Sequence, residues 1–226
     1  MVNAATQDVL GKEGGAKNEV LGIGIGCPGS IDRSTGVVRT TPNLGWTDYP
    51  IRNRVTSLLD LPAVLDNDAN CATYAEWWQG SGKGAEHLIG ITLGTGIGGG
   101  VMLGGKILRG ASGSAGEVGH TTIDYNGRPC ACGHRGCLEA YASGPSIALR
   151  ATEGIRSGSK SILTELVDGD LDHISSALIF EAVKLGDEYA YEIMIETAKL
   201  LGIGIANIIN TLNPDVVVDV GGVVGA

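Results

Sequence analysis

The segment from Glu117 to Glu139 constrains this chain more than any other, because it holds three of the five cysteines within eight residues. An imidazole lies ten positions before the first of these thiols. Thiolates combined with an imidazole form the ligand set of a closed, tetrahedral zinc site. Gly133 and Gly136 would let the backbone turn tightly enough for the sulfur atoms to converge. The sequence therefore predicts a zinc-bound loop whose ligands are His120, Cys130, Cys132 and Cys137.

A disulfide and plain buried thiols are the alternatives to a metal site at these cysteines. The C-x-C spacing is short for a disulfide, and no secretory signal is recognised. His134, inside the loop, is a second candidate for the imidazole ligand and ranks below His120. Cys27 and Cys71 lie apart and are interpreted as core thiols, and free thiols of this kind indicate a reducing, cytoplasmic location.

Acidic residues lie at both ends of the cysteine segment. Glu117 comes three residues before His120, and Glu139 comes two residues after Cys137. A bound metal would fix the residues on either side of the loop, and both carboxylates would then be held beside it. This pattern predicts a polar binding site that zinc braces.

Composition restricts the partners of the chain. It has 226 residues, a formal net charge of −9 and a sequence pI near 4.8, with no extended run of Lys or Arg. These values argue against nucleic acid or an anionic membrane surface as a partner. The longest apolar stretch, 200–212, is interrupted by Asn207 and Asn210 and is too short to span a bilayer. The 37 glycines follow no collagen period and cluster in loops between apolar runs.

Strand-like and helix-like segments alternate along the chain, which predicts an α/β fold. Short apolar runs that end at turn residues are expected to be strands at 20–27, 37–39, 62–65, 87–93, 100–103 and 215–220. Helical spacing predicts helices over 49–59, 69–79, 143–154, 162–168, 175–184 and 187–212. The segment 41–46 is expected to be a loop.

Three short motifs follow expected strands, where α/β proteins place their ligands. The first is the run LGTGIGGG from Leu93 to Gly100. Its successive N–H groups suit phosphate oxygens, and the Thr95 hydroxyl adds a donor. The run is neither a Walker loop nor a dinucleotide fingerprint, because no Lys-Ser/Thr pair and no helix follow it. A glycine-rich hairpin without a ligand is the other interpretation.

The second and third motifs are equally short. In Asp66-Asn67-Asp68, a carboxylate at a strand end can accept a proton from a hydroxyl. The alternative is an Asx turn that caps the following helix. Gly221-Gly222 suits close packing of a flat ring, or a plain turn. Together with the braced glutamates, these motifs describe a sugar site that faces a nucleotide site.

Six motifs occur in a characteristic order along the chain. They are GxGxPGxID from Gly24, NDAN from Asn67, LGTGIGGG, GEVGH from Gly116, CxCGxxGCLE, and NPDVVV ahead of Gly-Gly. From about Val20 onward the chain resembles the ROK family of sugar kinases and sugar-responsive repressors, and most closely its bacterial glucokinases. The resemblance implies an actin-like, RNase H-like ATPase fold of two domains that close over hexose and ATP. Residues 1–86 are then expected in a small N-terminal domain and residues 87–226 in a large C-terminal domain.

The resemblance also implies roles for the residues that match the family motifs. Asp68 matches the catalytic base. The hexose ligands match Asn67, Glu117, His120 and Glu139. The zinc ligands match His120, Cys130, Cys132 and Cys137, so that His120 has both roles. The nucleotide loops match Gly94, Thr95 and Gly96 for phosphate, and Gly221 and Gly222 for adenosine.

The resemblance implies transfer of phosphate from ATP, with Mg²⁺, to the 6-hydroxyl of glucose by a homodimer or homotetramer. Fructose, N-acetylglucosamine and N-acetylmannosamine are alternative substrates. The family's first phosphate loop, D-x-G-G-T, has no counterpart before Val20, and only four residues follow Gly222. We therefore expect a truncated chain, and a catalytically inactive sugar-binding fragment is an alternative. A repressor is least expected, because residues 1–19 lack the basic character of a DNA-binding helix-turn-helix.

Overall fold

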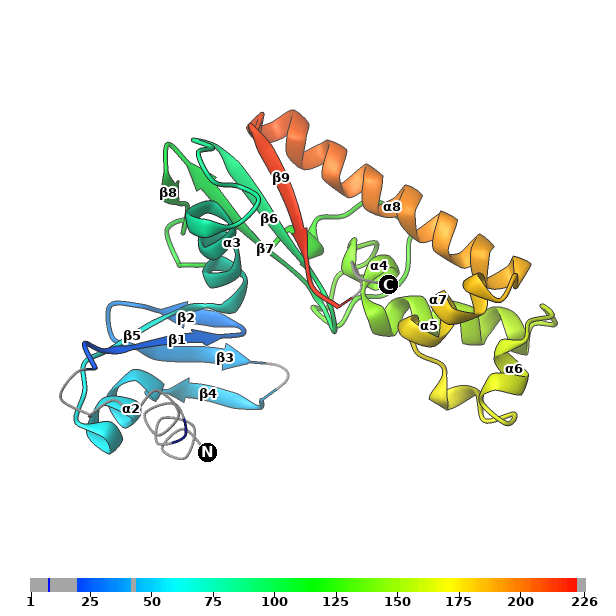
Figure 1. The fold of residues 1–226 in the computed structure, drawn as a ribbon, viewed down its shortest axis with the longest axis horizontal. Helices are drawn as coiled ribbons and strands as arrows, with labels where there is room; N and C mark the ends of the chain where they lie inside the picture. Colours follow the sequence, from blue (N-terminus) through cyan, green and yellow to red (C-terminus); the bar gives the residue numbers. More distant parts are fainter. Residues whose placement is uncertain (1–7, 9–19, 42–43, 223–226) are drawn as a thin grey trace. The chain divides into compact units, whose positions relative to one another are not determined.

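The computed structural model describes residue 8, residues 20–41 and residues 44–222. The chain forms two compact units, which are considered one at a time (Figure 1). The first comprises residues 1–71 and 109–115, and the second comprises residues 72–108 and 116–226. The domain boundary predicted between residues 86 and 87 stays a prediction.

The first unit contains two small sheets and the helix α2. Its elements are β1 (Ile23–Cys27), β2 (Ser30–Asp32), β3 (Val37–Thr41), β4 (Trp46–Tyr49), α2 (Ile51–Leu59) and β5 (Ala63–Asn67). β1 and β5 run parallel, with Cys27 opposite Asn67, and β2, β3 and β4 form an antiparallel sheet. The core between them consists of Cys27, Ile31, Val38 and Leu65.

The second unit is built on a four-stranded sheet in the order β8-β7-β6-β9. These strands are β6 (Leu88–Leu93), β7 (Ile97–Leu103), β8 (Lys106–Ile107) and β9 (Val216–Val220). β6 pairs antiparallel with β7 and parallel with β9. Gly90 and Gly100 sit where the sheet meets a helix: a Cβ on either would lie 2.3 Å from Thr73 Oγ1, so only glycine allows this approach.

Helices complete the second unit, and the longest of them, α8, is the orange helix of Figure 1. They are α3 (Asp68–Gln79), which begins in the first unit, η2 (Val118–His120), α4 (Glu139–Ala142), α5 (Gly144–Arg156), α6 (Leu163–Leu166), η3 (Leu171–His173), α7 (Ser176–Lys184) and α8 (Glu188–Leu212). Within the described residues, no helix is long and apolar enough to cross a bilayer.

Helix starts in the second unit follow directly from local sequence. Ser143, Ser175 and Asp187 were predicted to open helices, and they are the N-caps of α5, α7 and α8, respectively. Their side chains accept N–H groups of the first turn, at 2.6 Å in the case of Asp187 and Ala190. Such a cap satisfies a backbone donor that the helix itself leaves unpaired. The α/β class and these three helices are confirmed.

Several predicted boundaries are wrong. β7 begins at Ile97 rather than at residue 100, and the helix predicted over 162–168 is only the short α6. The segment 41–46 was predicted to be a loop, but β4 starts at Trp46, where pairing with β3 and stacking of Trp46 on Tyr49 at 4.3 Å favour a strand. Because Tyr49 belongs to that strand, the next helix starts at Ile51. Residues 42–43 lie outside the described residues.

Candidate functional site

The four predicted metal ligands lie together in the second unit. One ligand atom from each comes within 4.8 Å of all the others. The Sγ atoms of Cys132 and Cys137 are 3.6 Å apart, and His120 Nδ1 is 3.7 Å from Cys130 Sγ. In a tetrahedral zinc site with metal–ligand bonds of about 2.0–2.3 Å, ligand atoms are roughly 3.3–3.8 Å apart. The grouping of His120, Cys130, Cys132 and Cys137 therefore fits zinc.

The second imidazole candidate, His134, lies at the edge of this group. Its Nδ1 is 3.5 Å from Cys132 Sγ, but the residue is exposed and is not part of the four-residue cluster. The structure thus brings His120, rather than His134, together with all three thiols. Because Nδ1 of His120 faces the thiols, its other ring nitrogen is available to a second partner.

The cysteine loop is shaped by its own backbone. The N–H of Cys130 donates to the His134 carbonyl at 2.9 Å, and the N–H of Gly136 donates to the Arg128 carbonyl at 2.8 Å. Gly136 has φ +69°, and a Cβ there would lie 1.6 Å from the Asp124 carbonyl oxygen, so no other residue fits. Glycine at position 136 is therefore a steric requirement, and it forms part of the tight turn that the sequence suggested.

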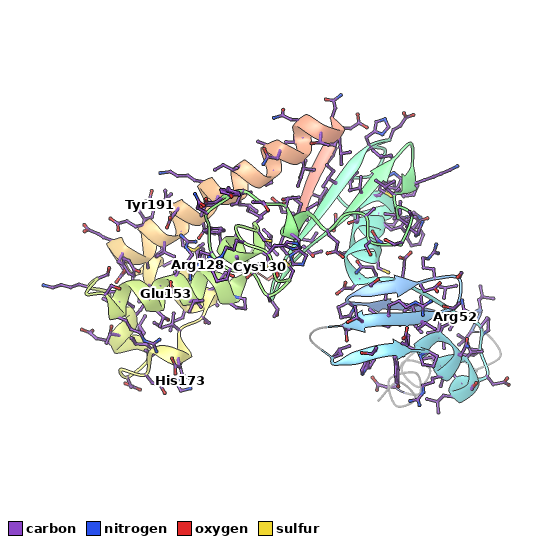
Figure 2. All side chains as sticks on the ribbon, turned by 180° about the vertical axis from the view of Figure 1, so that it is seen from behind. Arg52, Arg128, Cys130, Glu153, His173 and Tyr191 are labelled. Carbon is purple, nitrogen blue, oxygen red and sulfur yellow. The ribbon has the colours of Figure 1, made fainter. Side chains whose placement is uncertain are left out.

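An ion pair joins the cysteine loop to a helix. Figure 2 shows Arg128 beside Cys130, and the guanidinium of Arg128 contacts the carboxylate of Glu153 on α5 at 2.8 Å. The loop is therefore attached to the helical part of the unit as well as held by its internal backbone hydrogen bonds.

The three thiols differ in acidity because their surroundings differ. The His134 backbone N–H donates to Cys132 and lowers the pKa of that thiol to about 6. Burial, with further contributions from the other two thiols, raises the pKa of Cys137 to about 12. Burial also raises the pKa of Cys130. Since zinc binds thiolates, loading this group with metal would release protons.

The two predicted sugar-binding glutamates flank the cluster as expected. Glu117 immediately precedes η2, the short helix that ends at His120, and its side chain is exposed. Glu139 is the first residue of α4, and its Oε2 accepts the N–H of Ile97 at 2.8 Å. Glu139 thus reaches the glycine loop between β6 and β7, a contact that sequence reasoning missed.

That glycine loop is tighter than the sequence suggested. The N–H of Gly94 donates to the Gly96 carbonyl at 3.0 Å, so it is used within the turn. The N–H of Ile97 is bound to Glu139. Among the described residues, only the N–H groups of Thr95 and Gly96 in this turn are left without a partner. The predicted row of phosphate-binding amides is therefore reduced to these two, together with the exposed Thr95 hydroxyl.

The second glycine motif lies at the same edge of the sheet. Thr92 pairs with Val220 in the parallel β6–β9 ladder, so both strands end side by side. Gly221 follows with φ +123°, and a Cβ there would lie 2.3 Å from the Leu93 carbonyl oxygen. The predicted phosphate loop and the Gly221-Gly222 turn therefore come together at the carboxyl ends of adjacent parallel strands, where α/β proteins bind ligands.

In the first unit, Asn67 and Asp68 occupy the junction of β5 and α3. The Oδ1 of Asn67 accepts the N–H of Asn70 at 3.1 Å and so caps the helix, while its Nδ2 donates to the Gly29 carbonyl at 3.3 Å. Asp68 is exposed, and its Oδ1 accepts the N–H of Ala69 at 3.0 Å. The Asx-turn alternative thus applies to Asn67 and leaves the Asp68 carboxylate accessible.

Asp66 has a different environment from Asp68. Its Oδ2 lies 2.8 Å from a guanidinium nitrogen of Arg109 and 3.1 Å from one of Arg33, and its Oδ1 accepts the N–H of Asn67 at 2.9 Å. Sequence reasoning missed both arginines, because they lie 33 and 43 residues away and belong to no motif. Asp66 therefore joins three segments of the first unit.

Tyr141 is a further residue that the sequence did not single out. It is buried on α4, two residues after Glu139, and its hydroxyl accepts the N–H of Arg128 at 2.8 Å and donates to the Asp124 carboxylate at 3.1 Å. A Cβ on Gly127 would lie 2.0 Å from the same hydroxyl. The cysteine loop is thereby tied to the helix that carries Glu139.

We expect the substitution Tyr141→Phe to lower the free energy of unfolding by about 0.5–1.5 kcal/mol, because the part-buried N–H of Arg128 and the Asp124 carboxylate lose their partner. Urea unfolding of the metal-loaded chain measures this change. Tyr125→Phe is the matched control, since Tyr125 lies on the same loop and is 87% exposed. Equal stability of the two variants would mean that the Tyr141 hydroxyl does not hold the loop.

Comparison with known proteins places this arrangement in a family. The model of the ROK family matches residues 2–226. A glucokinase of Halalkalibacterium halodurans is 43% identical over 210 residues, which cover 92% of this chain and 63% of that protein. A putative xylose repressor of Caldicellulosiruptor sp. is 39% identical over 200 residues, which cover 88% of this chain and 49% of that protein. The chain thus spans less than two thirds of either relative.

A solved structure agrees with these sequence matches. The ROK family glucokinase of Streptomyces griseus, solved in complex with glucose and AMPPNP, superposes with a TM-score of 0.83 at 35% identity. The match covers 98% of this chain and 72% of that one. The actin-like ATPase fold expected from the motifs is therefore confirmed. On the family match, the sequence identity and the shared fold together, the chain belongs to the ROK family.

Proposed function

We propose that this chain forms the sugar and nucleotide sites of an ATP-dependent hexose kinase that phosphorylates the 6-hydroxyl of glucose. The observation that carries the proposal is the similarity, over almost the whole chain, to a glucokinase solved with glucose and a nucleotide analogue. It is supported by the second unit, in which the predicted metal ligands, Glu139 and both glycine motifs are grouped around one sheet edge and one loop.

Sugar recognition is assigned to four polar side chains. Asn67, Glu117, His120 and Glu139 are proposed to bind the ring hydroxyls. Several paired hydrogen bonds discriminate between epimers, because a misplaced hydroxyl leaves a buried group unpaired. His120 would hold zinc through Nδ1 and present its other nitrogen to a hydroxyl, since metal binding fixes the orientation of the ring. His120, Cys130, Cys132 and Cys137 would hold the zinc ion, which would supply a structural brace.

Phosphate transfer is assigned to Asp68 and the glycine loops. Asp68 would accept the proton of the 6-hydroxyl as the phosphoryl group arrives, which is the role of a general base. The N–H groups of Thr95 and Gly96 would bind phosphate oxygens of ATP, and Gly221 and Gly222 would pack against its adenosine. ATP would bring Mg²⁺, which neutralises charge on the phosphates in reactions of this type.

Two other functions are alternatives. Fructose, N-acetylglucosamine or N-acetylmannosamine would be the substrate if the ring ligands fit those sugars better. The other alternative is a sugar-binding protein without turnover, either an inactive fragment of a kinase or a sugar-responsive repressor; the 39% identity to a putative xylose repressor supports only the second of these. A kinase and a sugar-binding protein without turnover differ in one property: only the kinase transfers phosphate to the bound sugar.

A paired experiment tests the proposal. ATP-dependent phosphorylation of a panel of hexoses is followed by a coupled assay, and binding of the same hexoses without ATP is followed by calorimetry. Glucose is expected to bind and to turn over fastest. Binding of a hexose without turnover would exclude an active kinase for this chain, and binding of none would exclude the sugar site.

Self-association is also expected. Apolar side chains on and next to α8 are partly exposed to solvent, namely Leu185, Tyr191, Ile195, Ile203 and Ile209. Exposed apolar surface of this kind is typical of an interface between subunits. We propose a homodimer or homotetramer, and sedimentation velocity should show it; a clean monomer at micromolar concentration would contradict this.

The cytoplasmic location stays a prediction.

A further inference from the structure

The carboxylate of Glu139 links two loops that the motifs treat as separate. Its Oε2 accepts the N–H of Ile97 at 2.8 Å, and Ile97 is the first residue after the turn Gly94–Gly96. Glu139 is assigned to the sugar, whereas this turn is assigned to the phosphates of the nucleotide. One carboxylate oxygen therefore holds the phosphate loop, and the other is left for a sugar hydroxyl.

The position of the Glu139 carboxylate depends on the absence of a Cβ atom at position 96. A Cβ at Gly96 would lie 2.6 Å from Glu139 Oε2 and 3.5 Å from its Cδ, closer to the oxygen than Cβ atoms come in proteins. Gly96 does not have a positive φ, so alanine would fit its backbone conformation. A Cβ at Gly94, in the same turn, would meet nothing within 4 Å. A side chain at position 96 would therefore have to move the Glu139 carboxylate, whereas one at position 94 would not.

Hydrogen bonds on either side of such a contact hold the backbone of Glu139 in place. Its carbonyl oxygen accepts the Ser146 hydroxyl at 2.7 Å. The N–H of Gly144, which opens the next helix, donates to the Gly94 carbonyl at 2.9 Å. Two hydrogen bonds therefore hold α4 and α5 at a fixed distance from the loop, and a methyl group at position 96 has to displace the carboxylate.

We propose that Gly96 is a positioning residue for the sugar ligand Glu139, and that sugar and phosphate occupancy influence each other through the Glu139–Ile97 hydrogen bond. This inference rests on the proposed function for the identity of the sugar ligand. Coupling between two sites is reciprocal, so a sugar that orders Glu139 also orders the exit of the phosphate loop. Coupling factors between linked sites are typically about 5–150-fold.

Substitution at two glycines, one in the loop and one outside it, separates this inference from a general effect of an added methyl group. Equilibrium dialysis with radiolabelled glucose, in the absence of nucleotide, measures sugar affinity alone. Gly96→Ala is expected to raise the Kd for glucose by about tenfold or more, because the charged hydrogen-bond acceptor is displaced. Gly202→Ala, on α8 and outside the proposed sites, is the control; a Cβ there meets nothing within 4 Å, so this variant should leave the Kd within about twofold. Equal effects of the two variants, or no effect of Gly96→Ala, would overturn the inference.

A double-mutant cycle shows whether Gly96 acts through Glu139. If the alanine methyl group acts only by displacing the carboxylate, the variant G96A/E139A should bind glucose as E139A alone does. Neighbouring residues that act through one another are not additive in such a cycle. Additive losses would mean that Gly96 affects the sugar by another route, and the positioning role would be wrong.

A measurement without sugar keeps the inference separate from the proposed function. Amide hydrogen exchange of Ile97, followed by NMR on the ligand-free chain, reports the hydrogen bond to Glu139 directly. Exchange should accelerate in G96A and in E139A and stay unchanged in G202A. Unchanged exchange in G96A overturns the link between the loops even if glucose binds. Accelerated exchange in a chain that binds no hexose would instead exclude the proposed function and, with it, the sugar role of Gly96.

Discussion

Replacement of Asp68 by Asn is expected to lower kcat for hexose phosphorylation by about 10²–10⁴-fold, with little change in KM for the sugar. Asn has nearly the same shape and can still accept the N–H of Ala69, which Asp68 Oδ1 contacts at 3.0 Å. It cannot accept the proton of a sugar hydroxyl. The assay is a coupled measurement of ATP-dependent phosphorylation, on a protein that carries this chain together with a D-x-G-G-T phosphate loop.

Two neighbouring acids serve as comparisons for Asp68. Asp60→Asn removes a charge from an exposed left-handed position, φ 50°, that Asn tolerates, so it should leave kcat unchanged. Asp66→Asn removes a partner of Arg33 and Arg109 and should cost about 1 kcal/mol of stability, because both arginines are partly exposed. Equal losses of kcat at Asp66 and Asp68 would indicate an effect of charge or folding. A large loss at Asp66 alone would show that Asp68 is not the base.

Loss of the metal is expected to destabilise the second unit more than any of the other predicted changes. The chain should carry about one zinc ion, and Cys132→Ser should abolish its retention during purification. Zinc sites of this kind contribute about 10–16 kcal/mol in isolated peptides. The loss here should be smaller, because backbone hydrogen bonds and the Tyr141 hydroxyl also hold the loop. Affinity for glucose should fall as well, since Glu117 and Glu139 flank the loop.

The controls for the metal prediction lie in the same chain. Cys71→Ser changes an exposed thiol outside the four-residue group and should keep the metal. His134→Ala should also keep it, because His134 lies at the edge of the group and beside Cys132 rather than among all three thiols. Metal content is measured by mass spectrometry and stability by calorimetry. A folded chain without metal, in which all three thiols react freely, would contradict the zinc assignment.

Features encoded within a few residues were predictable from the sequence. Ser143 and Asp187 open helices because a cap acts on backbone groups two or three residues ahead. The thiols and His120 lie within eighteen residues of one another, so their spacing alone indicated a metal site. The fold class followed from the alternation of segments, and the family followed from the order of the motifs.

Contacts between distant segments were not predictable in the same way. Asp66 meets Arg109, 43 residues away, and Glu139 meets Ile97, 42 residues away. No local pattern shows which distant residue each of these side chains contacts, because packing of the whole unit determines the partners. The glycine loop shows the same limit: its composition suggested a row of free N–H groups, whereas Glu139 and the turn itself use two of them.

Transfer of phosphate from ATP to glucose tests the proposed kinase activity most directly. Phosphorus NMR of a reaction with ATP, Mg²⁺ and glucose identifies both the product and the position of the new phosphate ester. We predict glucose 6-phosphate from the protein that carries this chain together with a D-x-G-G-T phosphate loop, with Asp68 intact and zinc bound, and none from its Asp68→Asn variant within the same time. Formation of no sugar phosphate by a protein that binds glucose and ATP, or of an ester at another hydroxyl, would contradict this prediction.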